Sequence, residues 1–380
     1  MPHLDWIEQI APAYVRTLDF YQPGKPMDEL ERELGIRGAI KVASNENPLG
    51  PSPRALEAVT AALPTLHLYP DAGGFALRRA LAAALGNRGG VDGIALGAGS
   101  NDLLYQLVLA TCEPDDEVLS HASAFLSYRL APAVAGRTFV SAPTTPRLSI
   151  DVDALIARMT PRTKLVLVGT PNNPTGSVIT RAELARLLDA LPARALLVVD
   201  EAYAEYAAAW PEVDHADGLA LADPRVVVLR TFSKIYGLAG LRVGYAVADP
   251  AVVGLLGRVM RTFHVNSLAQ VAAIAALSDT AHVAASAQHG RYAIEQMTQH
   301  LRAPLERRGG GVLPSLGNFV LVDAGQPTGA AYDALLRRGV IVRPMAAWGL
   351  PNHLRVSAAS RADLPKVIEA LLAVLAPAGG

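Results

Sequence analysis

Short runs of apolar residues, each bounded by turn-forming residues, recur along this chain. Runs of this length and composition are typical of strands buried on both faces in the middle of a sheet. The runs lie at Gly93–Leu96, Glu117–Leu119, Lys164–Val168, Ala195–Val199, Val226–Leu229 and Val243–Ala248.

Stretches with helical periodicity separate these runs. Two helix starts are clearly marked: Thr180-Arg-Ala-Glu183 has the pattern of a capping box, and Ser52-Pro53 places a cap residue before a first-turn proline. The alternation of strands and helices predicts a mainly parallel sheet with helices on both faces. The clearest helical stretches are Asn101–Thr111, Asp151–Met159 and Ala182–Ala190.

In a sheet of this kind, ligands bind outside the carboxyl ends of the strands. Polar motifs follow five of the six predicted strands, all except the last. We therefore expect a binding site where these five motifs meet.

Composition narrows the class of protein. A chain of 380 residues that is 51% hydrophobic can bury a large core, and its length suggests two or three domains. A net charge of −1 gives no basic footprint for nucleic acid. The single cysteine, Cys112, excludes an intrachain disulfide and fits a reducing cytoplasm. Because no signal peptide and no apolar stretch of membrane-spanning length is found, we expect a soluble cytoplasmic protein without a membrane partner.

The segment that follows Val226–Leu229 carries the most specific chemistry. Hydroxyl groups at Thr231 and Ser233 flank Lys234, and Arg242 follows eight positions after the lysine. A lysine of lowered pKa attacks carbonyl groups, while hydroxyl groups and a guanidinium bind a phosphate dianion. A carbonyl compound that carries a phosphate fits pyridoxal phosphate, whose aldehyde forms a Schiff base with lysine. Taken alone, the segment fits a solvated surface lysine equally well.

Two further motifs favour the same cofactor. Gly169-Thr-Pro-Asn-Asn-Pro-Thr-Gly176 predicts a rigid loop whose amide side chains can donate to a phenolate oxygen. Asp200 ends the run Ala195–Val199, so burial would require a cationic partner, and a protonated pyridine nitrogen would serve. Tyr203, three positions later, could reach the phenolic oxygen of the ring. Asp200 could also cap a helix, which does not conflict with this role.

Two weaker motifs complete the set. Gly97-Ala-Gly-Ser-Asn-Asp102 opens a helix with small residues, so its free N–H groups could bind phosphate, although a tight turn is the simpler interpretation of this motif alone. Phe125, in Ser120–Tyr128, could stack on a planar ring, although a lone phenylalanine is more typical of a core.

Together and in this order, these motifs resemble the fold-type I aminotransferases that depend on pyridoxal phosphate. The chain more narrowly resembles the histidinol-phosphate aminotransferase family, in the class II subgroup. The resemblance covers the chain from about Tyr21 to the C-terminal helix. It implies a three-layer α/β fold with a mainly parallel sheet and a smaller α+β domain. The narrower likeness rests on Val42–Pro53, Tyr69–Gly73, Thr231–Tyr245 and His264–Ala269.

The resemblance implies a role for each matching position. Lys234 would bind the cofactor and act as general acid and base, Asp200 would keep the ring nitrogen protonated, and Tyr203 would be the third catalytic residue. Asn173 and Tyr203 would bind the phenolic oxygen, and Phe125 would stack on the ring. A neighbouring subunit would contribute Tyr69 to the phosphate, which implies a homodimer with shared active sites. Within one subunit, the phosphate would be bound by Ser100, Asn101, Thr231, Ser233 and Arg242.

Three positions match the family's substrate site. Arg355, in His353-Leu-Arg-Val-Ser357, matches the arginine that binds the α-carboxylate of amino-acid substrates. Arg343 and Tyr21 match positions that handle the phosphate of the other substrate. Alternatively, Arg343 could belong to a solvated face together with Arg337 and Arg338. No metal is expected.

The predicted organisation is a large cofactor-binding domain of residues 50–260 and a small domain of residues 1–49 plus 261–380. The predicted reaction converts histidinol phosphate and 2-oxoglutarate, an amine donor and a 2-oxoacid acceptor, to imidazole acetol phosphate and L-glutamate, as in histidine biosynthesis. The alternatives are an aromatic amino-acid aminotransferase, a lyase resembling threonine-phosphate decarboxylase, and a non-catalytic module that kept the fold. The presence of Lys234, Asp200 and Arg242 argues against the last.

Overall fold

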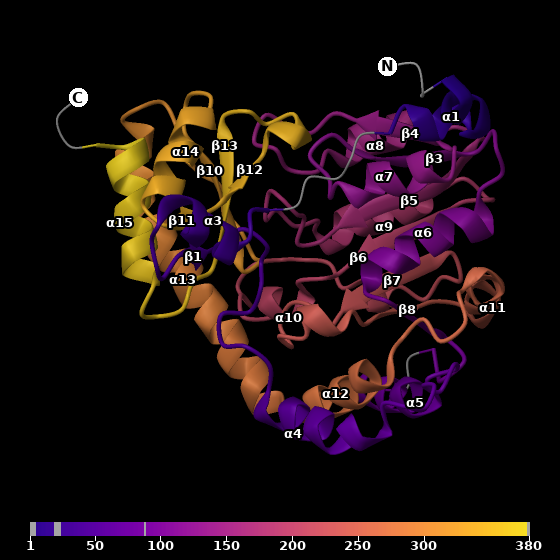
Figure 1. The fold of residues 1–380 in the computed structure, drawn as a ribbon. Helices are drawn as coiled ribbons and strands as arrows, with labels where there is room; N and C mark the ends of the chain where they lie inside the picture. The colour runs from indigo at the N-terminus through magenta and orange to yellow at the C-terminus, as the bar shows by residue number, and fades with distance from the viewer. Residues whose placement is uncertain (1–4, 19–23, 87–88, 378–380) are drawn as a thin grey trace.

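The computed structural model describes residues 5–18, 24–86 and 89–377. Figure 1 shows a large sheet on one side and a small sheet on the other, and the long helix α13 (Thr280–Glu306) runs from the bottom of the view, near α4 and α12, up to the small sheet. The predicted division into residues 50–260 and residues 1–49 plus 261–380 stays a prediction.

The large sheet has seven strands in the order β2-β8-β7-β6-β5-β3-β4. Strands β4, β3, β5, β6 and β7 are parallel, and β8 is antiparallel to both of its neighbours. All six predicted strands are confirmed. The seventh strand, β4, was missed because most of its residues are partly or fully exposed at the sheet edge, so it contains no continuous apolar run. The strands are β2 (Ile94–Gly97), β3 (Glu117–His121), β4 (Thr138–Ala142), β5 (Thr163–Gly169), β6 (Leu196–Asp200), β7 (Val226–Thr231) and β8 (Gly244–Val247).

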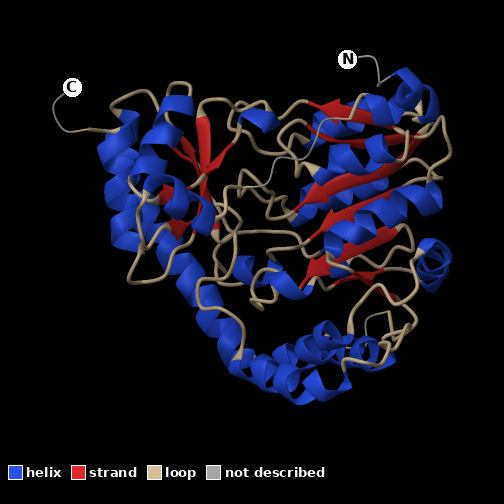
Figure 2. Ribbon diagram, viewed as in Figure 1, coloured by secondary structure: helices blue, strands red, loops and turns tan. Residues whose placement is uncertain are grey.

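Helices cover both faces of this sheet, as Figure 2 shows. Leu165 and Leu167 of β5 face one group of helices, whereas Val166 and Val168 face the other. Because successive side chains of a strand point to opposite faces, a strand buried on both sides is apolar at every position. The prediction of a mainly parallel sheet between two helical layers is confirmed. One face packs against α6 (Ser100–Thr111), α7 (Ser127–Val134) and α11 (Pro250–Val259); the other packs against α8 (Val152–Arg158), α9 (Arg181–Asp189), α4 (Pro53–Ala62), α5 (Phe75–Ala84) and α12 (Ser267–Ser278).

The predicted helix starts have different outcomes. The capping box of α9 is confirmed, since the Thr180 hydroxyl accepts from the Glu183 N–H and the Glu183 carboxylate accepts from the Thr180 N–H. Ser52 does occupy the cap position of α4, but its side chain does not cap that helix. It donates instead to the Asp279 carboxylate, 2.6 Å away at the start of α13.

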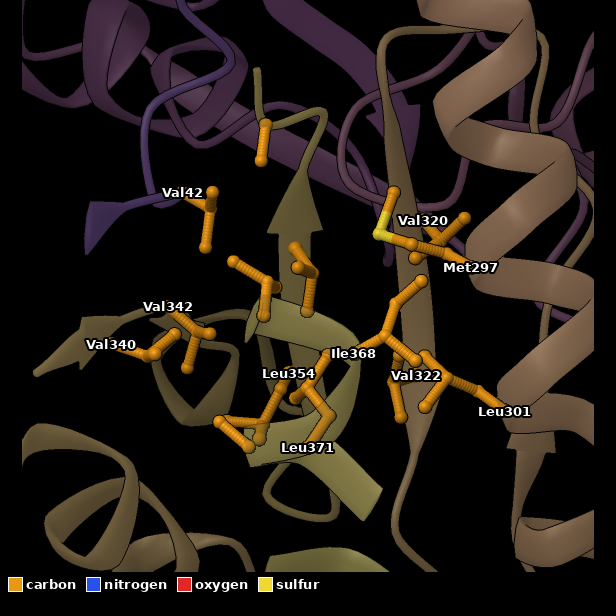
Figure 3. Packing of buried hydrophobic residues seen from close by; sticks show 14 of the residues in the cluster. Val42, Met297, Leu301, Val320, Val322, Val340, Val342, Leu354, Ile368 and Leu371 are labelled. Carbon is orange, nitrogen blue, oxygen red and sulfur yellow. The ribbon is translucent and has the colours of Figure 1, made fainter. Parts of the chain in front are cut away.

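The small sheet is antiparallel, in the order β12-β13-β10-β9, and packs against α13, α14 and α15. Figure 3 shows its core, in which Val320 and Val322 of the sheet meet Met297 and Leu301 of α13. A separate parallel pair joins β1 to β11, so the N-terminal part of the chain contacts this region. The elements are β1 (Ile40–Lys41), β9 (Gly311–Val312), β10 (Phe319–Asp323), β11 (Val340–Ile341), β12 (Arg343–Pro344), β13 (His353–Ser357), α14 (Gly329–Arg337) and α15 (Leu364–Leu375).

Short helices complete the described chain: α1 (Asp5–Ile10), α2 (Ala13–Arg16), α3 (Met27–Leu34) and α10 (Ala204–Ala207), with 3₁₀ turns at Leu63–Thr65, Gly218–Ala220, Ala239–Leu241 and Ala346–Trp348. In the described part of the chain, no single helix is long and apolar enough to cross a membrane; α12 and α13, bent by 81° at their junction, satisfy that criterion only as a pair.

Candidate active site

The strands β5, β6 and β7 point their carboxyl ends toward the small sheet, as their arrowheads in Figure 2 show. At these ends lies a cavity of about 150 Å³. Ten of the eleven predicted cofactor residues line it, so the five motifs that follow the strands do meet. The ten are Ser100, Asn101, Phe125, Asn173, Asp200, Tyr203, Thr231, Ser233, Lys234 and Arg242.

One corner of the cavity is built for an anion. The guanidinium of Arg242 donates to the Ser233 hydroxyl at 3.3 Å, and the N–H of Ser233 donates to the Thr231 hydroxyl at 3.1 Å. Helix α6 begins at Ser100, so the free N–H groups of its first turn face the same corner. Gly99 has φ +87°, a backbone conformation that residues with a side chain rarely adopt, so glycine is favoured at this position. This corner therefore offers the donors that a phosphate needs, namely a guanidinium, two hydroxyl groups and the N–H groups at the start of a helix.

Lys234 lines the cavity, and its amine donates to the carbonyl oxygen of Ser44 at 3.0 Å. Burial lowers the pKa of Lys234 to about 8, and the positive charges of Arg355 and Arg242 lower it further. About a tenth of the amine is therefore uncharged at pH 7, far more than for an ordinary lysine, and the uncharged form is the one that attacks a carbonyl group.

Asp200 is buried at the end of β6 without a cationic partner in hydrogen-bonding contact among the described residues. Tyr128 donates to its carboxylate at 3.1 Å and the N–H of Ala202 donates at 3.2 Å. Burial nevertheless raises the pKa of Asp200 to about 6. A cation placed beside this carboxylate would offset the cost of burying it, so a protonated pyridine nitrogen suits the position.

Tyr128 is the first residue that sequence reasoning did not assign. It lies in α7, is fully buried, and contacts Phe125 edge to face with ring centroids 5.8 Å apart. The sequence contains no signal for its contact with Asp200, because the two residues are 72 positions apart and meet only in the folded sheet.

Tyr203 is held from the N-terminal part of the chain. The Asn45 side-chain amide donates to the Tyr203 oxygen at 2.9 Å, and both residues are buried. Burial raises the pKa of Tyr203 to about 12, so the phenol keeps its proton at physiological pH. The segment around Asn45 was recognised as a family motif, but none of its residues was predicted to contact the site.

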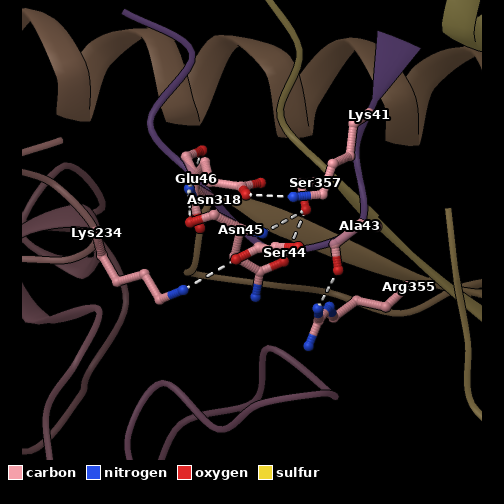
Figure 4. A network of polar contacts seen from close by, with 9 residues as sticks. All are labelled: Lys41, Ala43, Ser44, Asn45, Glu46, Lys234, Asn318, Arg355 and Ser357. Carbon is pink, nitrogen blue, oxygen red and sulfur yellow. Dashed lines mark hydrogen bonds and ion pairs between the residues drawn. The ribbon is translucent and has the colours of Figure 1, made fainter. Parts of the chain in front are cut away.

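The two predicted substrate arginines lie on adjacent antiparallel strands. Arg343 of β12 is directly opposite Arg355 of β13, so their side chains leave the same face of the small sheet. Arg355 donates to the Asn173 side-chain oxygen and to the Ala43 carbonyl oxygen, each at 2.6 Å. Arg343 packs over the ring of Trp348, 5.4 Å from its centroid. Arg355 is therefore joined to the cavity through Asn173. Figure 4 shows Arg355 and Lys234 on opposite sides of the segment that contains Ala43 and Ser44.

Among the predicted cofactor residues, Tyr69 does not line this cavity. The Tyr69 side chain is 82% exposed and stacks on Phe263, with ring centroids 4.5 Å apart, so it does not line the cavity of its own chain. Tyr21 lies outside the described residues.

The residues present fit pyridoxal phosphate. The Arg242 corner provides donors for a phosphate, Lys234 provides an amine for an aldehyde, and Asp200 lacks the cation that a pyridinium would supply. A larger groove of about 1080 Å³ lies between α13 and α15, but it contains none of the predicted site residues. Within the described residues, no group of three or more histidine, cysteine, aspartate or glutamate side chains could hold a metal ion.

Comparisons with known proteins agree with this geometry. The family model for aminotransferase class I and II matches residues 37–371. A histidinol-phosphate aminotransferase of Anaeromyxobacter sp. is 46% identical over 369 residues, covering 96% of this chain and 99% of the relative. Histidinol-phosphate aminotransferase 2 of Methylococcus capsulatus is 45% identical over 378 residues, covering 98% and 100%. The crystal structure of histidinol-phosphate aminotransferase from Sinorhizobium meliloti in complex with pyridoxal-5'-phosphate is similar with a TM-score of 0.81 at 29% identity, covering 96% of both chains.

Proposed function

The chain belongs to the aminotransferase class I and II family, among the histidinol-phosphate aminotransferases, and on this premise we propose that it transfers the amino group of histidinol phosphate to 2-oxoglutarate. The enzyme depends on pyridoxal phosphate and releases imidazole acetol phosphate and L-glutamate. The observation that carries the proposal is the cavity in which an amine of lowered pKa, a buried carboxylate and an anion corner lie together beside two arginines.

When bound, the cofactor supplies an electron sink for the carbanion that forms at the substrate Cα. The surrounding residues hold it and move the proton. Arg242 and the start of α6 would bind the phosphate, Phe125 would stack on the ring, and Asp200 would keep the ring nitrogen protonated. Asn173 and Tyr203 donate to the phenolic oxygen. The Lys234 amine would take the proton from the substrate Cα and give it up again, a role that its place in the cavity lining and its lowered pKa favour.

The arginine pair supports a substrate with two separated anionic groups. Arg355, buried and bonded to Asn173, binds the α-carboxylate of glutamate beside the cofactor. Arg343, opposite Arg355 on the neighbouring strand, binds the phosphate of histidinol phosphate together with Tyr21. The names of the two relatives described above favour this substrate over an aromatic amino acid.

We further propose a homodimer in which Tyr69 binds the cofactor phosphate of the neighbouring subunit. The support is that Tyr69, which is itself 82% exposed, and several large apolar side chains close to it in the sequence are exposed to solvent. Exposed apolar side chains gathered in one segment favour an interface at that segment. The exposed side chains of this segment are Leu56, Leu63, Leu66, Leu68, Tyr69 and Phe75.

Mixing two inactive variants tests the shared site. Refolded mixtures of Tyr69→Ala and Lys234→Ala subunits should recover activity, because a mixed dimer contains one site with both residues intact. Sedimentation should show a dimer. A monomer, or mixtures without recovery, would contradict shared sites.

A cytoplasmic location and the two-domain division are also part of this proposal. The first is supported by a single, buried cysteine, Cys112, and the second by the separate large and small sheets.

A half-reaction tests the function itself. Cofactor-loaded protein is mixed with L-histidinol phosphate without any 2-oxoacid, and the visible absorption band is followed. Loss of the band without release of carbon dioxide is the expected result. An unchanged band with L-histidinol phosphate but loss with L-phenylalanine would favour the aromatic alternative. Release of carbon dioxide would favour the lyase.

A further inference from the structure

Asn45 occupies an unusual position between the two sheets. It is 1% exposed, and its φ of +56° is in the left-handed region that asparagine tolerates better than most residues. Its backbone carbonyl oxygen accepts from the Asn318 side chain at 3.2 Å. Its side-chain amide lies between Ser357 on β13 and Tyr203 beside the cavity, as Figure 4 shows for the Ser357 side of this contact.

The hydrogen bonds to Ser357 fix the orientation of this amide. The Asn45 backbone N–H donates to the Ser357 hydroxyl oxygen at 2.8 Å, so the hydroxyl hydrogen must be donated elsewhere. It is donated to the Asn45 Oδ1 atom, also at 2.8 Å. If the amide were turned over, the hydroxyl hydrogen of Ser357 would have no acceptor among the described residues. Because Ser357 is buried, that arrangement would be costly.

This orientation determines what Tyr203 can do. Since Oδ1 faces Ser357, the Asn45 Nδ2 atom faces Tyr203 and donates to its oxygen at 2.9 Å. The phenol therefore accepts from Asn45 and has one hydrogen left to donate. The ring is held in place by edge-on packing against Phe319, with centroids 5.1 Å apart. Tyr203 also lines the cavity that contains Lys234. The remaining hydrogen is therefore available to an acceptor in the cavity.

We propose that Asn45 and Ser357 are positioning residues that make Tyr203 a hydrogen-bond donor toward the cofactor. The bonds run in one direction, from the Asn45 backbone N–H to Ser357, from Ser357 to the Asn45 amide, and from that amide to Tyr203. Neither Asn45 nor Ser357 touches the cofactor, and both act through the phenol.

The inference rests on the proposed function, because the acceptor of the Tyr203 hydrogen is the phenolic oxygen of pyridoxal phosphate. A hydrogen bond donated to that oxygen stabilises its anionic form and so lowers the pH at which the Lys234-bound cofactor loses its proton. Loss of the donor should raise the apparent pKa of the visible chromophore. A hydrogen bond to a charged acceptor corresponds to about one to two pH units.

The decisive variant is Asn45→Asp, which keeps the size of the side chain but removes both amide hydrogens. The ionised carboxylate of this variant can only accept, so Tyr203 would donate to it and no longer to the cofactor. We expect the apparent pKa of the chromophore to rise by about one to two pH units, as in Tyr203→Phe. In the Tyr203→Phe background, Asn45→Asp should add no further rise, since no phenol hydrogen remains to be redirected.

Two further variants separate this effect from charge and from misfolding. Asn47→Asp makes the same substitution two residues later, where the amide donates to the Ile235 carbonyl and to Ser286 and not to Tyr203. Asn47→Asp should shift the apparent pKa of the chromophore much less than Asn45→Asp does. If Asn45→Asp does not fold, Ser357→Ala removes the hydroxyl that fixes the amide. In Ser357→Ala the apparent pKa of the chromophore should then rise by less than in Asn45→Asp. In Ser357→Thr, which keeps a hydroxyl group, it should return to the value of the unmodified protein.

Three results would overturn the proposal: an unchanged pKa in both Asn45→Asp and Ser357→Ala, an equal shift in Asn47→Asp, or a full additional shift when Asn45→Asp is added to Tyr203→Phe. The measurement needs only the cofactor-loaded protein and a pH titration of its absorbance. If L-histidinol phosphate fails as substrate while the band is present, the substrate proposal fails and this one remains testable. If no band forms in the unmodified protein, the cofactor proposal itself fails.

Discussion

The active site has two sides that differ in origin. The sheet edge consists of residues that directly follow strands of the large sheet, such as Asp200 after β6 and Lys234 after β7. The covering side consists of residues 42–47 and β13, which include Asn45, Arg355 and Ser357. Residues of the sheet edge are placed by the strand that precedes them. Residues of the covering side are placed by partners 158 to 312 positions away in the sequence.

The two sides also differ in their charges. At the sheet edge, burial raises the pKa of Asp200 and lowers that of Lys234, so both charged forms are disfavoured there before any ligand is bound. On the covering side, Arg355 is buried but bonded to Asn173 and Ala43. The sheet edge therefore has buried charged groups that a cofactor would stabilise, whereas Arg355 on the covering side already donates hydrogen bonds within the protein.

The largest effect is expected at the sheet edge. Lys234→Ala should abolish both turnover and the visible band of the bound cofactor, because no other amine lies among the residues lining the cavity. Absorbance spectra and the half-reaction measure the two losses. Lys366→Ala, on an exposed side chain of α15, is the control and should leave both unchanged. A band that persists in Lys234→Ala would mean that the cofactor is bound elsewhere.

On the covering side, the effect should fall on substrate and not on cofactor. Arg355→Ala should lower kcat/KM for glutamate by more than a hundredfold, since loss of one partner of a buried, hydrogen-bonded charge pair costs about 3 kcal/mol. The visible band should remain. Arg343→Ala should reduce activity with L-histidinol phosphate more than with L-histidinol, which lacks the phosphate.

The exposed Arg338 provides the control for both arginines. Arg338→Ala should change neither kcat/KM nor the preference for the phosphate-bearing amine. An equal loss in Arg338→Ala and Arg343→Ala would favour the alternative in which these arginines form a solvated face. Loss of the visible band in Arg355→Ala would remove the distinction between the two sides.

The sequence predicts the sheet edge better than the covering side. All six predicted strands of the large sheet were found, because apolar runs and the motifs after them are local signals. Ten cofactor residues therefore meet in one cavity. The strand β4 was missed because it is partly exposed, and the side-chain role of Ser52 was wrong because its partner, Asp279, is 227 positions away. The contacts of Asn45 and Tyr128 depend on the packing of distant elements, which no local pattern records.

A smaller effect concerns stability at the sheet edge. Burial raises the pKa of Asp200 from 3.8 to about 6, so the folded apoprotein carries a penalty that is absent below pH 3.8 and complete above pH 6. Asp200→Asn should therefore stabilise the apoprotein at pH 7.5 by about 3 kcal/mol, and by about half as much at pH 5. Urea unfolding at pH 7.5 and at pH 5 measures this change in the free energy of unfolding. The same variant should bind the cofactor more weakly.

The control for this prediction is Asp153→Asn, on an exposed carboxylate of α8. Its effect on the free energy of unfolding should stay within about 0.5 kcal/mol at both pH values. If Asp200→Asn destabilises the apoprotein at pH 7.5, the carboxylate stabilises the fold by itself and is not held there for a cationic ligand.

The smallest effect tests whether the two sides are electrostatically coupled. With a pKa of about 8, Lys234 becomes uncharged as pH rises, so the rate at which the apoprotein takes up cofactor should increase about tenfold per unit up to pH 8 and then level off. The reference amine is Nα-acetyllysine, whose pKa is higher. Its rate of reaction with the cofactor should therefore keep rising above pH 8. Arg355 contributes to the lowered pKa of Lys234, so Arg355→Ala should move the plateau to higher pH, and Arg338→Ala should not. A plateau that stays at the same pH in Arg355→Ala would show that Arg355 does not lower the pKa of Lys234. The covering side would then have no part in activating the amine that it faces.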